Sequence, residues 1–297
     1  MYSGFPIDVA VAPCRCCFGA RMARAPQVIG AAVMPSKRLV QSLVIASLIA
    51  LAPALALARP AHQAVHDDLA PVSAAQIAAA IADPARTADN RALDAGRQPD
   101  AMLAFAKLRR GDVVGDWGAG GGYYSELIAD AVGPKGLVYA IGVAANYDAA
   151  KWQPVLAHHA NIRPLYVPGE AQALAPGSLD VIFTHLEYHD LYWSSAKYHY
   201  PVRDVDAVLR NWFAALRPGG RVIVIDHAAL PGDPRETAGK YHRIDPARVR
   251  ADFARAGFVL DGESSALHRE DDPHTVAVFD PGVRGHTDRF ALRFVKP

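Results

Sequence analysis

The sequence predicts an α/β protein whose mostly parallel sheet of seven strands carries helices on both faces. Three observations support this prediction. A glycine-rich turn joins a strand-like segment to a helix-like one near residue 118, the two kinds of segment then alternate, and the chain closes with a pair of strands. Because a helix that links two strands returns the chain to the same edge of the sheet, such alternation favours parallel strands.

The chain begins with residues that we do not expect to belong to this fold. Lys37 and Arg38 precede a long apolar run that ends at Ala56-Leu57-Ala58, the small-residue pattern of a cleavage site. We therefore expect a secretory signal peptide at residues 34–58 and an exported, periplasmic protein. If the run stayed uncleaved, it would instead tether the domain to a membrane. Residues 1–33 show no periodicity and are expected to be a disordered extension or an artefact of start-site choice.

The composition of residues 59–297 bounds the function classes. The three cysteines lie upstream, at positions 14, 16 and 17, so we expect no disulfide. Of the 31 basic and 30 acidic side chains in the whole chain, five and one precede residue 59, which leaves 26 and 29 and a net charge of −3. Since no basic stripe appears, we expect no nucleic-acid partner. A cleaved chain is also expected to lack stable membrane insertion, and its oligomeric state stays open.

Residues 59–98 are expected to form a flexible lead followed by a short helical cap. Ser73 is a typical N-cap residue for the alanine-rich segment 74–82. A second polar, helical stretch is expected to run to about Gly96. The main domain, 99–297, then opens with an amphipathic helix that begins at Pro99.

Strands and helices alternate through this domain. Strands are expected at 112–117, 136–141, 162–167, 179–184 and 221–226, with helices between them near 123–131, 148–157 and 202–216. The closing part is expected to contain a helix at 246–256, strands at 258–263 and 289–295, and an extended segment at 275–279.

The glycine-rich turn is the strongest sign of a ligand site. Residues 113–124 read VVGDWGAGGGYY, a strand followed by a turn and the start of a helix. Glycines let backbone N–H groups approach a ligand closely, because no Cβ intervenes. Counted from Gly118 the spacing is G-x-G-x-G, whereas the dinucleotide pattern G-x-G-x-x-G would need a glycine in place of Tyr123. A sharp strand-to-helix connection without a ligand is the alternative interpretation.

This turn, with Asp116 two residues before its first glycine, resembles the first motif of class I S-adenosylmethionine (SAM) dependent methyltransferases. The resemblance implies a Rossmann-like class I methyltransferase fold, SAM as cofactor, and methyl transfer to a small or medium-sized substrate. It also implies that the cofactor contacts the turn residues Asp116, Gly118, Ala119, Gly120, Gly122 and Tyr123. Glu170 and Ala171, after the third expected strand, stand where the family often has an acid that meets the adenine amino group.

Further segments extend the resemblance over residues 85–297. Residues 176–182 (PGSLDVI) resemble the family's entry into its fourth strand, and residues 216–222 (LRPGGRV) carry its L-x-P-G-G turn. Segments of a group of predicted bacterial methyltransferases with signal peptides are similar to residues 187–192, 241–246 and 284–290. The resemblance to this group does not give a substrate.

One position departs from the family pattern. The second strand usually ends in an acid whose carboxylate binds both ribose hydroxyls, whereas this chain has Ile141 and Gly142 there. We expect Asn146 or a backbone group to replace that carboxylate.

Two loops at the carboxyl edge of the expected sheet hold the candidate catalytic residues, because open parallel sheets bind ligands beyond that edge. His189, after the fourth strand, is the candidate general base, with Asp190 to orient its ring. His242, after the fifth strand, is expected to be its partner or a substrate contact. Arg243 is expected to bind an anionic group of the substrate.

Two alternatives use the same fold or the same loop. His185 and His189, four positions apart, could serve an exported metal-binding protein, with Asp226, His227 and His242 as further ligands. The metalloprotease pattern H-E-x-x-H is not met, and the preferred site is expected to contain no metal ion. The other alternative is a non-catalytic binding protein on the methyltransferase fold. Export also separates the protein from the cytoplasm, where SAM is made.

Overall fold

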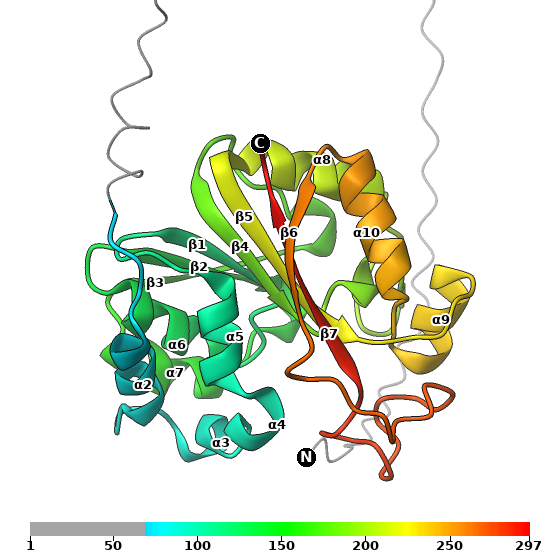
Figure 1. Ribbon diagram of the computed structural model, residues 1–297, viewed down its shortest axis with the longest axis horizontal. Coiled ribbons are helices and arrows are strands. Elements are labelled where there is room, and N and C mark those ends of the chain that lie inside the picture. The colour runs from blue at the N-terminus through cyan, green and yellow to red at the C-terminus, as the bar shows by residue number, and fades with distance from the viewer. Residues whose placement is uncertain (1–68) are drawn as a thin grey trace, which may run out of the picture. The chain divides into compact units, whose positions relative to one another are not determined.

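The computed structural model describes residues 69–297, which belong to one compact unit (Figure 1). The expected signal peptide at 34–58, the extension at 1–33 and the start of the flexible lead lie outside the described residues. Among residues 69–297, no helix combines the length and the apolar character needed to cross a membrane. This part holds a complete sheet and two apolar clusters, so residues 59–297 contain what an independent domain needs.

Seven strands form a single sheet in the order β3-β2-β1-β4-β5-β7-β6. The first five strands are parallel, while β7 runs antiparallel to both of its neighbours, β5 and β6. The seven-stranded, mostly parallel sheet predicted from the sequence is thus confirmed. The strands are β1 Val113–Trp117, β2 Leu137–Val143, β3 Ile162–Val167, β4 Leu179–His185, β5 Leu216–His227, β6 Val259–Ser264 and β7 Arg289–Val295.

Helices cover both faces of the sheet. Figure 1 shows α2, α5, α6 and α7 on one side and α8 and α10 on the other. The α-helices are α2 Ala74–Ala82, α3 Ala88–Arg91, α4 Asp94–Arg97, α5 Pro99–Ala106, α6 Tyr123–Val132, α7 Ala149–His158, α8 Val205–Ala215, α9 Pro234–Tyr241 and α10 Pro246–Arg255. Three single-turn 3₁₀ helices are η1 Ala144–Asn146, η2 Gly169–Ala171 and η3 His189–Leu191.

The two apolar clusters lie on opposite faces of the sheet, because successive side chains of a strand point in opposite directions. In β4, Val181 and Phe183 belong to the cluster under α6, and Ile182 belongs to the cluster under α8. Fully buried tryptophans anchor both clusters, Trp152 of α7 in the first and Trp212 of α8 in the second. This double packing fixes the carboxyl ends of the strands, where the loops with polar residues begin.

The helical cap forms as expected and is fastened to α6. Ser73 caps α2 through a reciprocal pair of hydrogen bonds with Gln76. The second polar stretch forms two short helices, α3 and α4. The fully buried guanidinium of Arg86 donates to the carboxylates of Asp94 in α4 and Glu126 in α6, at 2.8 Å each. The cap therefore packs on the helix that follows the glycine turn.

The segment 275–279, expected to be extended, instead forms bends and turns. Its backbone does not pair with a strand, since the N–H of Val278 donates to the carbonyl of Tyr241 at the end of α9. The expected extended segment is therefore wrong.

Helix α9 was not predicted, although its start carries a clear signal. Asp233 caps it by accepting from the N–H groups of Arg235 and Glu236, and Pro234 occupies the first turn. The helix ends at His242, whose φ of 53° lies in the left-handed region. This ending turns the His242 side chain toward the loop after β4.

Candidate functional site

A cleft opens at the carboxyl ends of the parallel strands. Its walls come from the ends of β1, β2, β3 and β4 and from the loop before α8, as expected for ligand sites of open α/β sheets. The lining residues are Trp117, Gly118, Gly120, Gly142, Val143, Asn146, Tyr166, Gln172, Glu187, Asp190, Leu191, Tyr200 and Arg203.

The glycine turn forms the floor of this cleft and needs its glycines. Gly118, Gly120 and Gly122 all have positive φ, at 78°, 54° and 86°. A Cβ on Gly118 would overlap the Cγ of Glu187, and one on Gly122 would lie 3.0 Å from the ring of Trp152. The turn is therefore shaped both by backbone conformation and by the side chains that pass directly over it.

The other predicted residues of the turn lie behind the cleft. Asp116 is buried and accepts a 2.5 Å hydrogen bond from Ser125 Oγ, and burial raises the pKa of its carboxyl to about 6. Tyr123 donates its hydroxyl to Asp94 of the cap, and its ring packs under Arg97. Ala119 is buried, and its N–H donates to the carbonyl of Ile141. These residues hold the turn in place.

The end of β2 explains the missing acid. A Cβ on Gly142 would overlap the ring of Tyr166 from β3, so the crossing ring requires glycine there. Asn146, three residues after β2, lines the same cleft and donates its Nδ2 to the hydroxyl of Tyr200 at 3.2 Å. The amide of Asn146 thus presents a polar group to the cleft.

Glu170 lies beside the cleft, and Ala171 follows it as the last residue of η2 but lines neither hollow. Glu170 lines a neighbouring groove with Pro168 and Gly169, and the two hollows share Val143 and Tyr200. From the same segment, Gln172 reaches the cleft, where its Oε1 accepts from Arg203 at 2.5 Å. Gln172 therefore lines the same cleft as the glycine turn, whereas Glu170 does not.

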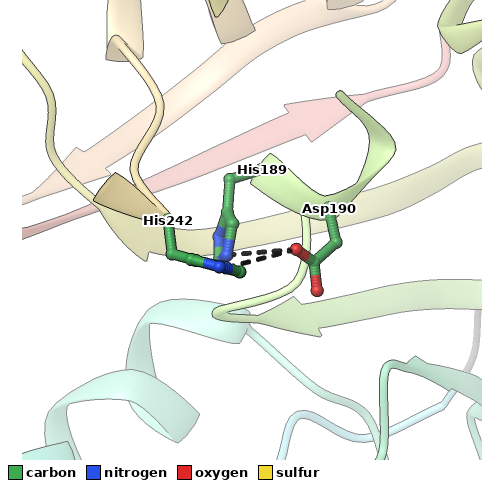
Figure 2. A group of neighbouring side chains, drawn as sticks. All are labelled: His189, Asp190 and His242. Carbon is green, nitrogen blue, oxygen red and sulfur yellow. Dashed lines mark ion pairs between the residues drawn. The ribbon is translucent and has the colours of Figure 1, made fainter. Parts of the chain in front are cut away.

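Three of the predicted catalytic side chains converge around Asp190, which lines the cleft (Figure 2). His189 Nε2 lies 3.3 Å from Asp190 Oδ1, and His242 Nδ1 lies 3.7 Å from the same oxygen. His189 and Asp190 belong to η3 after β4, whereas His242 follows α9. Residues that are more than fifty positions apart in the sequence thus share one site.

Asp226, at the end of β5, orients the ring of His189. Its Oδ1 lies 2.8 Å from His189 Nδ1, and its Oδ2 accepts from the backbone N–H of His189 at 2.8 Å. The carboxylate is fully buried. Because Nδ1 is held in this way, Nε2 faces Asp190 and His242.

The electrostatics of the site are dominated by buried acids. Burial alone would lower the pKa of His189, but the charges of Asp226 and Asp190 outweigh it and raise that pKa to about 9. Burial, reinforced by Asp190, also raises the pKa of the Glu187 carboxyl well above its usual range. The two acids therefore favour the charged form of the His189 ring, and burial favours the neutral form of Glu187.

His185 and His227 do not join this group. Both rings are buried, and burial lowers the pKa of each well below the usual value for histidine. His227 Nδ1 lies 2.7 Å from Thr287 Oγ1, while His185 packs against the ring of Tyr124. The pair of His185 and His189, considered from the sequence as metal ligands, is thus not the set whose atoms converge.

Arg243 has a different place from the one expected. Its guanidinium is fully buried, forms a two-pronged ion pair with Asp272 at 2.8 and 2.9 Å, and donates to the carbonyls of Val276 and Ala228. No donor of this side chain is exposed to a substrate. We therefore assign Arg243 to the fold of the loop after α9 rather than to an anionic substrate group.

The sequence interpretation missed the aromatic loop between β4 and α8. Trp193 packs on the rings of His242 and Tyr200, with ring centroids 5.0 and 4.9 Å apart. The ring of Phe279 also packs edge-on against His242, with a centroid distance of 4.9 Å. Tyr200 and Arg203 also line the cleft. The signal was present, because four aromatic residues fall within residues 192–200 directly after the candidate loop.

The sheet order and the two helical layers define the Rossmann-like class I methyltransferase fold. The chain is similar to a SAM-dependent methyltransferase from Aquifex aeolicus, with 19% identity, a TM-score of 0.50, and coverage of 76% of this chain and 99% of that one. A SAM-dependent methyltransferase from Mesorhizobium loti has 14% identity and a TM-score of 0.47, with coverage of 68% and 99%. No protein-family model and no curated protein matches the chain.

Proposed function

We propose that this protein is a SAM-dependent methyltransferase that acts on a small or medium-sized substrate. The observation that carries the proposal is the cleft floor of positive-φ glycines at the carboxyl end of β1, closely covered by Glu187. Such a floor brings backbone groups to a ligand without side chains in between. The converging polar residues at one end of the same cleft supply the second half of an active site.

The residues of the cleft fit SAM. Gly118 and Gly120 provide the close backbone approach, with Asp116, Ala119, Gly122 and Tyr123 supporting the turn behind it. The aromatic rings of Trp117, Tyr166 and Tyr200 offer flat surfaces for an adenine ring, with Glu170 in the adjoining groove and Ala171 next to it in the chain. Acidic side chains suit the cationic cofactor, and Asn146 can accept or donate to a ribose hydroxyl. When bound, SAM supplies an electrophilic methyl group.

The acceptor belongs at the other end of the cleft. His189, Asp190 and His242 face one another there, and Trp193 and Phe279 pack around His242. Since Asp226 fixes Nδ1 of His189, Nε2 faces the acceptor, and it can take the proton of the nucleophile once the ring has lost its own. Positioning of the acceptor and removal of its proton are the tasks that methyl transfer leaves to the protein.

The experiment that tests this proposal is calorimetric titration of residues 59–297 with SAM and with S-adenosylhomocysteine. We expect micromolar dissociation constants for both, and loss of binding in Gly120→Val, whose side chain would enter the cleft. Gly219→Val is the matched control, because Gly219 also has positive φ, at 75°, but lies in open space away from the cleft. A folded protein that binds neither compound contradicts the proposal. Binding without methyl transfer to any acceptor would leave a non-catalytic binding protein.

Export is part of the proposal and rests on the residues before the described fold. Lys37 and Arg38, the apolar run and the Ala56-Leu57-Ala58 pattern support a cleaved signal peptide. We expect the native protein to begin at Arg59 and to be found in the periplasm. Cell fractionation followed by N-terminal sequencing would identify both the compartment and the first residue of the native protein. A cytoplasmic fraction with an intact amino end would contradict export.

A further inference from the structure

We propose that His189, Asp190 and His242 form a binding site for a divalent transition-metal ion at the end of the cleft. The site departs from the expectation that no metal ion is involved, and it differs from the His185 pair considered from the sequence. Its role in catalysis rests on the proposed function, but the binding of the ion does not.

The three potential ligand atoms have the spacing of a metal site. His189 Nε2, Asp190 Oδ1 and His242 Nδ1 all lie within 4.8 Å of one another, with the shorter distances at 3.3 and 3.7 Å. Nitrogen and oxygen ligands at about 2.0–2.2 Å from an ion are roughly 3–4 Å apart, so small side-chain movements would close the set around it. Figure 2 shows the two rings beside the carboxylate, with the dashed ion pairs of both rings meeting at one oxygen of Asp190.

The first ligand is already oriented. Metal-bound histidines usually donate their second ring nitrogen to a carboxylate, which fixes the ring and makes the ligand nitrogen more basic. The fully buried Asp226 holds His189 in this manner, through Nδ1 and through the backbone N–H. His242 is fixed by different means, since Trp193 and Phe279 pack against its ring.

The second ligand lacks a hydrogen-bonding partner. Among the described residues, Asp190 Oδ1 is a buried oxygen that accepts no hydrogen bond, although two imidazole nitrogens face it. Its ion-pair neighbours are the same two nitrogens that would bind a metal. An ion between the carboxylate and the two rings would give this buried oxygen a directly bonded partner.

The composition of the site limits the kind of ion and suggests its use. Two imidazoles and one carboxylate favour zinc, cobalt, iron or manganese over magnesium or calcium. Three protein ligands leave coordination positions open, as in catalytic metal sites. Because Asp190 also lines the cleft, an open position would face the acceptor. The geometry points to an acceptor with an oxygen donor, which the ion would bind and make more acidic. His189 then acts as a ligand, and the ion takes over the activation of the acceptor.

Cobalt(II) is the probe for the test, because its visible absorption reports the ligand set. Residues 59–297, without an affinity tag and treated with a chelator, would be titrated with cobalt(II) chloride. We expect one equivalent to bind with a visible spectrum of low-symmetry coordination. His242→Ala and Asp190→Asn should each lose this spectrum, and Asp226→Asn should weaken binding by about 10- to 100-fold, the usual effect of losing a group that orients a ligand.

His158→Ala is the matched control, because His158 is exposed at the end of α7, away from the cleft. It should bind cobalt as the parent chain does. The absence of bound cobalt in the folded parent chain, or equal binding in all variants, would overturn the metal site. Titration with S-adenosylhomocysteine is a separate measurement on the same samples. If the homocysteine derivative binds and cobalt does not, the metal site alone fails. If cobalt binds and the derivative does not, the methyltransferase proposal fails and the metal site stands.

Discussion

Gly118→Ala is expected to weaken the binding of S-adenosylhomocysteine by at least about 100-fold, which corresponds to about 2.8 kcal/mol of binding free energy. Two effects combine at this position. The φ of 78° disfavours any side chain, and the added Cβ would overlap the Cγ of Glu187, which crosses the turn at the carboxyl end of β1. Either the turn or Glu187 must move, and both line the cleft. Calorimetric titration measures the change.

Gly177→Ala separates the two effects. Gly177 has a similar φ of 61°, but a Cβ there would meet no atom within 4 Å. We expect this variant to lose about 1 kcal/mol of stability from backbone strain and to bind S-adenosylhomocysteine as the parent chain does. Equal affinity in both variants would show that the glycine floor does not contact the ligand.

Arg243→Leu is expected to lower the free energy of unfolding by about 3–5 kcal/mol, the usual cost of leaving a buried charge without its partner. Arg243 and Asp272 are both fully buried and joined by two hydrogen bonds, so the substitution strands the carboxylate of Asp272. Urea unfolding at neutral pH measures the loss. Because the guanidinium has no exposed donor, the affinity for S-adenosylhomocysteine should stay within about twofold.

Two further variants make this result interpretable. Arg243→Leu combined with Asp272→Asn removes the stranded charge and should recover part of the loss, since the asparagine oxygen can still accept from the N–H groups of His274 and Asp288. Arg250→Leu breaks a two-pronged pair with Glu263 at the surface and should cost at most about 1 kcal/mol. A small stability loss for Arg243→Leu together with a large loss of ligand affinity would show that Arg243 contributes to ligand binding after all.

The sequence predicted most of the fold because its signals are local. The Ser73 cap, the apolar stripe of α8 and the strand before the glycine turn each follow from neighbouring residues, and the structure contains all three. The segment at 275–279 misled the prediction, because distant groups hold its backbone: the carbonyl of Tyr241 accepts from Val278, and the paired guanidinium of Arg243 donates to Val276. Local alternation does not reveal such a partner.

The sequence predicted the part of the site that depends on the order of the strands. His189 and His242 follow neighbouring strands, so their approach follows from the expected parallel sheet. The role of Asp226 in fixing His189, the contribution of Tyr200 and Arg203, and the burial of Arg243 depend on how long loops fold back. Spacing along the chain cannot give these contacts. The resemblance implies that Glu170 meets the cofactor. In the structure Glu170 lines the adjoining groove, and Gln172, directly after η2, lines the cleft itself.

The position of β7 has a consequence for how the chain reaches its final state. The last strand lies between β5 and β6, and β6 has no other neighbour in the sheet. The sheet therefore cannot be completed until the final nine residues are available, and its closing contacts span large sequence separations, which slows folding. If the chain is exported as proposed, β6 and β7 would stay unpaired until the last residues have crossed the membrane.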